Sequence, residues 1–192
     1  MAYYDPHLRS QDVIDRLLGL DRELLAISIK EGFSIHSRIR IIIAGSSVLM
    51  LHGITRTMIS DDIDLIRLSA NIGPDLLSKY DMNTRIITYE NSLPYHYMDR
   101  IVKVDLPTKV IDYYALSLED AVAGKIYAWR GKDVDHLHDP EVIERIDWSK
   151  LKESICDLYN SLLNTWDFPW ICHRFNLYLE EVGHEELKFE NI

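Results

Sequence analysis

Two aspartates, Asp62 and Asp64, are separated by one residue in a short segment that alternates polar and apolar side chains. If this segment is a β-strand, both carboxylates point to one face of the sheet, and Ile63 and Leu65 point to the other. Carboxylate oxygens suit Mg²⁺, which keeps water ligands and accepts phosphate oxygens as well. The spacing therefore predicts a Mg²⁺ or Mn²⁺ site for a substrate that carries phosphate groups.

A turn with the character of a phosphate-binding site precedes the two aspartates. The run Ile39–Ala44 is rich in β-branched residues and almost continuously apolar, which predicts a buried strand that ends at Gly45. Gly45 lets the backbone approach a ligand closely. Ser46 and Ser47, with the backbone N–H groups of a short helix expected over 47–52, offer donors to an anion. A phosphate-binding turn combined with a dicarboxylate is what metal-assisted phosphoryl or nucleotidyl transfer requires.

Both features also have a purely structural interpretation. Asp62 and Asp64 could form the exposed face of an edge strand, and Gly45-Ser46 could be an ordinary turn between a strand and a helix. Three acidic residues lie within positions 61–64, and without a cation their carboxylates repel one another. This clustering favours the metal site.

The elements that must position these residues predict an α/β (α+β) fold. We expect a small mixed β-sheet flanked by helices, followed by a C-terminal helical bundle. Apolar residues recur at helical spacing over 10–31, and Ser10 or Asp5 is expected to cap this helix. Further strands are predicted over 62–66, 84–89, 101–106 and 110–114.

The second half of the chain is predicted to be mostly helical. Ser117, followed three residues later by Asp120, indicates the start of a helix. The pattern from Pro140 onward is helical and is interrupted at Pro169. We therefore expect an α/β domain over 1–139 and a helical extension over 140–192.

The order of the motifs resembles the DNA polymerase β-like nucleotidyltransferase superfamily. Its signature is a small residue, Gly, and Gly or Ser, followed by Asp-x-Asp, and Ala44-Gly45-Ser46 with Asp62-Ile63-Asp64 matches it. The intervening segment, Leu49 through Ser60, looks most like the abortive-infection (AbiEii-type) toxin nucleotidyltransferases. Ser46 replaces their second Gly, and the run before Asp62 is somewhat longer. The resemblance covers residues 39–139.

The resemblance implies charged site residues downstream. Family members carry a Lys, an Arg about five residues later and then Lys-Asp, which Lys125, Arg130 and Lys132-Asp133 match. By resemblance, Lys125 binds the triphosphate with help from Arg56 and Arg130, and Asp133 is a further acid near the site. Solvated helix charges are the competing interpretation of Lys125 and Arg130.

The family also places a third carboxylate on a later strand. Asp105, at the end of the predicted strand, fits that role, and Asp112 is the alternative. In this scheme Asp62, Asp64 and Asp105 hold the metal ions, and Asp105 helps to deprotonate the acceptor.

The function implied by the resemblance is Mg²⁺-dependent transfer of a nucleoside monophosphate from an NTP to an acceptor hydroxyl, with release of pyrophosphate. The toxin resemblance suggests RNA, such as a tRNA 3′ end, as the acceptor, and a cognate antitoxin as a partner. Three alternatives stay open: a small hydroxylated acceptor as in antibiotic nucleotidyltransferases, a protein acceptor, or a catalytically silent binding module.

Composition and charge restrict the classes further. The chain has 192 residues, 47% of them hydrophobic, which is ordinary for one globular protein with a substantial core. The net charge of −10 excludes a broad basic surface for duplex nucleic acid and counts against an extended RNA footprint. No apolar run is long enough to span a membrane, no secretory signal is visible, and two cysteines do not make a disulfide framework. We expect a cytoplasmic protein without a membrane partner.

The segment His136-Leu137-His138-Asp139, with Asp133 and Asp135, contains the residue types of a transition-metal site. The Asp-His that would complete a metallohydrolase signature does not follow His138. We therefore expect a solvated loop here, or His136 packed beside the active site.

Overall fold

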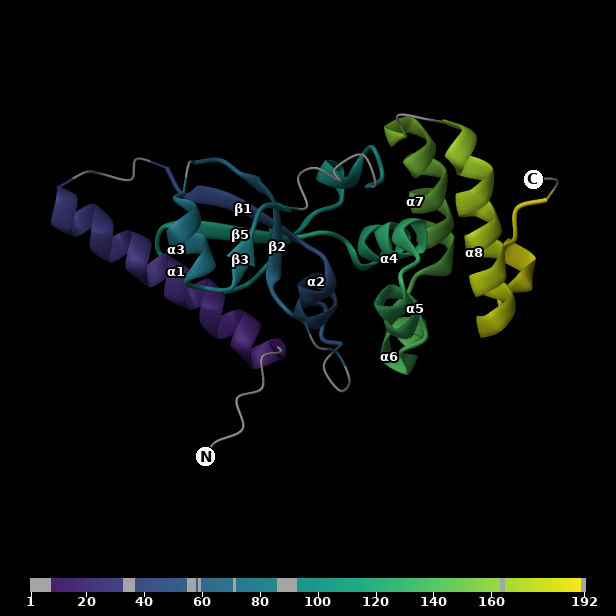
Figure 1. Ribbon diagram of the computed structural model, residues 1–192, viewed down its shortest axis with the longest axis horizontal. Helices are drawn as coiled ribbons and strands as arrows, with labels where there is room; N and C mark the ends of the chain where they lie inside the picture. Colours follow the sequence, from purple (N-terminus) through teal and green to yellow (C-terminus); the bar gives the residue numbers. More distant parts are fainter. Residues whose placement is uncertain are drawn as a thin grey trace. The chain divides into compact units, whose positions relative to one another are not determined.

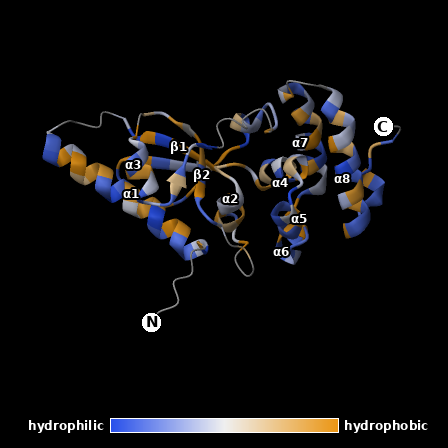
Figure 2. Ribbon diagram, in the orientation of Figure 1, coloured by the Kyte–Doolittle hydropathy of each residue, from blue (hydrophilic) through white to orange (hydrophobic). Residues whose placement is uncertain are grey.

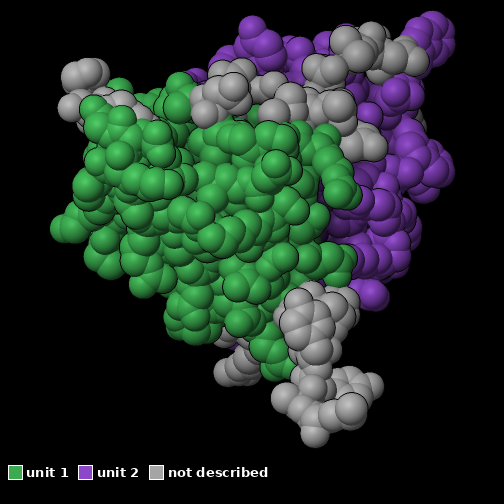
Figure 3. Space-filling model, turned by 60° about the vertical axis from the view of Figure 1, so that its left-hand side comes forward, with its two compact units in different colours: residues 1–87, 101–116 green, residues 88–100, 117–192 purple. Residues whose placement is uncertain are grey.

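The computed structural model describes residues 8–32, 37–54, 58, 60–70, 72–85, 93–162 and 165–190. The chain divides into two compact units, which Figure 3 colours green and purple. Unit 1 comprises Met1–Ile87 and Ile101–Leu116, and unit 2 comprises Thr88–Arg100 and Ser117–Ile192. This division differs from the boundary expected at 139/140, because the residues after Leu116 join the helical unit.

Unit 1 contains a five-stranded mixed sheet with the strand order β3-β2-β1-β5-β4 (Figure 1). The central strand β1 pairs antiparallel with β2 and parallel with β5, while β3 and β4 form the two edges. The strands are β1 Ile39–Ala44, β2 Ile63–Leu68, β3 Met82–Asn83, β4 Val102–Lys103 and β5 Ile111–Ala115. The expected α/β fold with a mixed sheet is confirmed.

Helix α1, Ser10–Glu31, is the longest element of unit 1. It buries Val13, Leu17 and Leu20, which follow helical spacing. The Tyr113 hydroxyl of β5 donates to the Leu17 carbonyl oxygen at 2.8 Å. Arg9 is the N-cap residue of α1, so Ser10 is its first residue rather than its cap, and Asp5 lies outside the described residues.

The antiparallel pair of strands β1 and β2, which the helix α2 separates in the chain, positions the candidate site. Ile41–Ala44 are fully or almost fully buried, as the apolar run predicted. The register pairs Ala44 with Asp64, so the end of β1 lies beside the start of β2. The short helix α2, Ser46–Leu51, follows directly after Gly45, and α3, Pro74–Ser78, lies between β2 and β3.

The edge strands differ from the prediction. Strand β3 occupies Met82–Asn83, and most of the strand predicted over 84–89 lies outside the described residues. Strand β4 covers only Val102–Lys103 of the predicted 101–106. Pro107 has no N–H, and Leu106 and Thr108 donate locally to Val104 and Leu106, so the ladder stops there.

Unit 2 is built from helices. They are α4 Leu118–Ala128, α5 Gly131–Leu137, α6 Pro140–Arg145, α7 Trp148–Ser161 and α8 Phe168–Val182, with the short 3-10 turns η2 Tyr97–Asp99, η3 Thr165–Asp167 and η4 Glu185–Leu187. The Ser117 side chain accepts from the Asp120 N–H at 3.1 Å, which confirms the predicted start of α4. Pro169 lies in the first turn of α8, where its missing N–H costs nothing.

Apolar stripes along α7 and α8 form the core of this unit. Leu151, Ile155 and Leu158 of α7 are fully buried, and Figure 2 shows apolar and polar residues alternating along both helices. Within the described ranges, no helix combines the length and the apolar character needed to cross a membrane.

Candidate active site

The turn after β1 has a conformation that only glycine adopts readily. Gly45 has φ 68° and ψ −156°. A Cβ atom at this position would overlap the carboxylate oxygen Oδ2 of Asp64. The backbone of Gly45 therefore lies directly against the Asp64 carboxylate. The close approach of a ligand to Gly45 stays a prediction.

Asp62 is held on both its backbone and its side chain. The Ser47 and Ser60 hydroxyls donate to its carbonyl oxygen at 3.1 and 2.7 Å. The amide Nδ2 of Asn83, on the neighbouring strand β3, donates to its Oδ2 at 2.6 Å. The side chains of Asp62 and Asp64 are both half-buried.

The donor set of this cluster fits a hard divalent cation. Asp64 lies in β2, Asp62 directly precedes this strand, and both side chains remain partly exposed. The described part of the chain contains no cluster of three or more His, Cys, Asp or Glu side chains that could bind a metal ion. Water and substrate phosphate oxygens would supply the remaining ligands, which is the usual pattern for Mg²⁺.

The serines after Gly45 have different surroundings. Ser46 is half-buried in the first turn of α2. Ser47 is fully buried, and its hydroxyl is occupied by the Asp62 carbonyl oxygen. The nucleotide contact predicted for Ser47 is therefore corrected: its hydroxyl fastens α2 to the segment that enters β2. Arg56, predicted to contact the triphosphate, lies outside the described residues.

The sheet register does not bring Asp105 to Asp62 and Asp64. Asp105 is exposed and follows Val104, whose N–H donates to the Tyr113 carbonyl oxygen. This part of β5 lies beside the start of β1, because Asp112 pairs with Arg40, whereas Asp64 pairs with Ala44. Four residues of strand correspond to roughly 13 Å.

The same register excludes Asp112 as the third carboxylate of this cluster. Its side chain forms ion pairs with Arg38 at 3.0 Å and Lys103 at 3.1 Å. Asp105 and Asp112 both lie at the end of the strands that is opposite to Asp62 and Asp64. The prediction that one of them is the third metal ligand is therefore wrong. The prediction failed because β4 is an edge strand whose antiparallel register with β5 places Asp105 near the level of Asp112, away from Asp64.

Unit 2 contains the other predicted group of charged residues. The Lys125 ammonium lies 3.2 Å from Asp133 Oδ1 and 3.0 Å from His136 Nδ1. Arg130 Nε donates to Asp133 Oδ2 at 2.7 Å. Lys125, Asp133 and His136 are buried, whereas the Arg130 side chain is 77% exposed. Asp133 thus serves both cations as a shared counter-ion.

Burial and charge shift the titration of this cluster. Burial lowers the pKa of Lys125 more than the neighbouring Asp133 raises it. Burial also lowers the pKa of His136 to about 4, and the Lys125 charge adds to this shift. For Asp133, burial acts to raise the pKa, but the hydrogen bond from Arg130 and the charge of Lys125 outweigh it, so the pKa is lowered. His136 is therefore neutral at pH 7, and its Nδ1 accepts a hydrogen bond from the Lys125 ammonium.

His136 and His138, in the segment considered as a transition-metal site, form different contacts. His138 binds the Val134 carbonyl oxygen and Glu181 Oε2, and the Asp139 side chain caps α6. His136 faces Lys125. The expectation of a solvated loop is therefore replaced by a short helix, α5, whose histidines make structural contacts.

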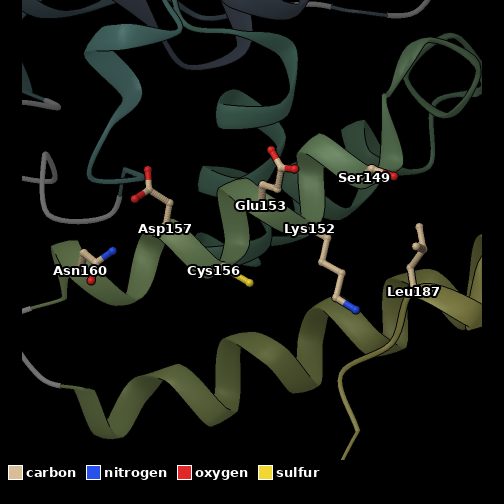
Figure 4. Close-up of a pocket in the computed structure, with 7 residues that line it drawn as sticks. All are labelled: Ser149, Lys152, Glu153, Cys156, Asp157, Asn160 and Leu187. Atoms are coloured by element: carbon tan, nitrogen blue, oxygen red, sulfur yellow. The ribbon is translucent and has the colours of Figure 1, made fainter.

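An open groove on α7 also contains polar groups (Figure 4). Its Lys152 ammonium lies 4.9 Å from the centroid of the Phe189 ring, and Asp157 binds His96 and Arg100. Burial raises the pKa of Cys156, so this thiol is protonated at neutral pH. The groove therefore offers no activated nucleophile among these residues.

Sequence reasoning missed two residues that hold Asp62. Ser60 and Asn83 contact it, yet Asn83 is 21 residues away in the chain. Parallel pairing of β2 with β3 brings Asn83 there, and nothing local in the sequence indicates that pairing. Ser60 lies only two residues before Asp62 in the sequence, but its hydrogen bond to the Asp62 carbonyl oxygen was not predicted.

The antiparallel pair β1 and β2 places the Gly45 backbone against the Asp64 carboxylate at one end of the mixed sheet. A protein family described as a nucleotidyltransferase of unknown function (DUF6036) matches residues 15–182 of the chain. The chain belongs to this family. No curated protein and no solved structure matches it.

Proposed function

We propose that the protein transfers a nucleotidyl group from an NTP to an acceptor hydroxyl, using a divalent cation held by Asp62 and Asp64. The contact between the Gly45 backbone and the Asp64 carboxylate carries this proposal. This contact supports the proposal because the turn after β1, with its half-buried Ser46, lies next to one of the two carboxylates. Family membership and the order of the motifs support the same reaction class.

The residues at the end of β1 and the start of β2 have distinct roles in this proposal. Asp62 and Asp64 bind the cation, and the backbone at Gly45 with the Ser46 hydroxyl contacts phosphate oxygens. When bound, Mg²⁺ supplies positive charge to the phosphates of the NTP. The acceptor oxygen attacks the α-phosphorus, the bond to the bridging oxygen breaks, and pyrophosphate leaves while the hydroxyl proton passes to water. The triphosphate contact of Lys125 remains a prediction from the resemblance.

Two observations favour different acceptors. The motif order resembles toxin nucleotidyltransferases, which favours an RNA acceptor and a cognate antitoxin. The net charge of −10 favours a small hydroxylated acceptor or a protein, because an extended RNA footprint needs basic side chains. The proposal therefore specifies the reaction, and the label-transfer experiment identifies the class of acceptor.

The experiment measures label transfer from each of the four α-³²P NTPs, in the presence of Mg²⁺. Total RNA, protein and small-molecule fractions are separated and counted. Asp62→Asn/Asp64→Asn is run in parallel and is expected to lose label by at least 100-fold. The control Asp15→Asn/Asp75→Asn removes the same charge at two exposed positions of unit 1 and is expected to keep full transfer.

The fraction that carries the label identifies the acceptor class. Label in RNA points to the toxin-like reaction, and label in protein or in small molecules points to the alternatives. If no fraction is labelled and Mg²⁺ with NTP does not raise the melting temperature, the transferase proposal is wrong and a silent binding module remains.

A further inference from the structure

We propose that Asn83 is a positioning residue that holds the Asp62 carboxylate ready for the divalent cation. This inference rests on the proposed function, since it concerns the same metal site. It adds to that site a neutral amide from an edge strand that the motif does not contain.

The orientation of the Asn83 amide is fixed at both of its polar atoms. The Arg85 N–H donates to Asn83 Oδ1 at 2.9 Å, so the oxygen is occupied by the backbone. The amide nitrogen must then face away from Arg85, and it donates to Asp62 Oδ2 at 2.6 Å. The reverse amide orientation would set the Nδ2 donor against the Arg85 N–H donor.

The pairing of β3 with β2 places Asn83 beside the two aspartates. Strand β3 pairs in parallel with β2, with Ile63 opposite Met82 and Asp64 opposite Asn83. The Ile63 N–H also donates to the Asp81 carbonyl oxygen at 2.8 Å. The position of Asn83 is therefore set by the backbone pairing of β3 with Ile63 and Asp64, the two residues directly after Asp62, and not by a mobile side chain alone.

An amide suits this position better than another carboxylate would in the absence of a cation. Three acidic residues already lie at positions 61, 62 and 64, and a donor beside Asp62 stabilises its charge without adding another negative charge. A carboxylate held in one orientation does not have to be ordered when the cation binds. Partners that orient metal-binding carboxylates typically change metal affinity by 10–100-fold when they are removed.

The test measures binding of Mn²⁺ alone to the full chain, by loss of the free Mn²⁺ signal in electron paramagnetic resonance. Asn83→Ala is expected to weaken Mn²⁺ binding at least tenfold. In the transfer assay it is expected to raise the metal concentration for half-maximal rate while kcat at saturating metal changes less than threefold. The neighbouring Thr84→Ala is the control and is expected to bind Mn²⁺ within twofold of the parent chain.

A second variant separates positioning from folding. Asn83→Ser keeps a short hydroxyl donor and is expected to bind Mn²⁺ with an affinity between those of the parent and Asn83→Ala. Urea unfolding of both variants shows whether the sheet is intact. If Asn83→Ala does not fold, the Ser variant decides the question by the same Mn²⁺ titration.

The outcomes distinguish the inference from the proposed function. If the parent chain binds Mn²⁺ and both Asn83 variants bind it equally well, the positioning role is wrong and the metal site stands. If Asp62→Asn binds Mn²⁺ as tightly as the parent, or the parent does not bind it, the metal site itself is wrong and the inference fails with it.

Discussion

Gly45 combines two constraints at one residue. Its φ and ψ lie in a region that is essentially restricted to glycine, and a Cβ atom would collide with Asp64. Other glycines with positive φ, such as Gly32, have nothing within 4 Å of the position of a Cβ. The requirement at Gly45 is therefore a close approach as well as a turn.

Gly45→Ala is expected to lower label transfer at least tenfold and the free energy of unfolding by about 1–3 kcal/mol. The added methyl group must displace Asp64 or shift the turn. Gly32→Ala, at the C-cap of α1, is the matched control: it is expected to cost about 1–2 kcal/mol and leave transfer unchanged. Label transfer and urea unfolding check both variants, and equal loss of transfer in the two would contradict the assignment.

His136 predicts a pH dependence of stability. Its pKa falls from 6.5 to about 4 on folding, chiefly because it is buried. The unfolded chain therefore binds more protons between these two pH values, and the stability that is complete above pH 6.5 is lost as the pH falls toward 4. Integrated over this window, the loss is at most about 3 kcal/mol.

Urea unfolding from pH 7 to pH 4 measures this loss directly. His136→Gln is expected to remove the part of the slope that belongs to His136, because glutamine does not titrate. His173→Gln changes an exposed histidine and is expected to keep the slope. The same slope in parent and His136→Gln would show that another group is responsible.

At the scale of elements, Asp21 fastens α1 to the sheet. Its carboxylate is almost fully buried and accepts N–H groups from Lys109, Val110 and Ile111, at 2.9–3.1 Å. These are the residues at which β5 begins. One carboxylate of the helix thereby orders the turn from β4 into β5, which lies beside β1.

Asp21→Asn is expected to lower the free energy of unfolding by about 3 kcal/mol, because the amide sets a donor against backbone donors. Asp15→Asn alters an exposed aspartate of the same helix and is expected to change stability by less than about 0.5 kcal/mol. Chemical denaturation of the two variants is the measurement. A loss at Asp21 no larger than that at Asp15 would show that the bonds to β5 contribute little.

At the scale of the whole molecule, the chain crosses between its two units three times. Arg100 explains why the segment Thr88–Arg100 belongs to the helical unit. Its guanidinium binds Asp120 of α4 at 2.9 Å and Asp157 of α7 at 2.9 Å. Both carboxylates are buried, and Ser154 adds a further bond to Asp120 at 2.8 Å.

Arg100→Met is expected to destabilise the protein by about 3–5 kcal/mol at pH 7, because two buried carboxylates lose their cation. Part of the loss should be regained at pH 5: burial acts to raise the pKa of Asp157, the bonds from His96 and Arg100 lower it, and removing Arg100 lets this carboxylate protonate more readily. Lys150→Met breaks a surface ion pair with Asp147 and is expected to cost less than about 1 kcal/mol. Thermal and urea unfolding at the two pH values check this, and a cost below 1 kcal/mol for Arg100→Met would contradict it.

Local patterns in the sequence determined the buried strand that ends at Gly45 and the strand that contains Asp64. The apolar run before Gly45 and the alternation around Asp62 and Asp64 are set by periodicity and turn chemistry, which act over a few residues. The same holds for Ser117, whose capping of α4 depends on a residue three positions later. The two strands and the start of α4 were predicted correctly because the information they need is contained in the segment itself.

Only the tertiary structure decided which distant residues meet. Asn83 reaches Asp62 through the pairing of β2 with β3, and Asp105 is kept from it by the register of β4 and β5. The burial of Lys125 with Asp133 and His136 depends on the packing of α5 on α4. These contacts follow from sheet register and helix packing, which depend on the sum of many weak nonlocal interactions. The sequence of a single segment therefore does not indicate them.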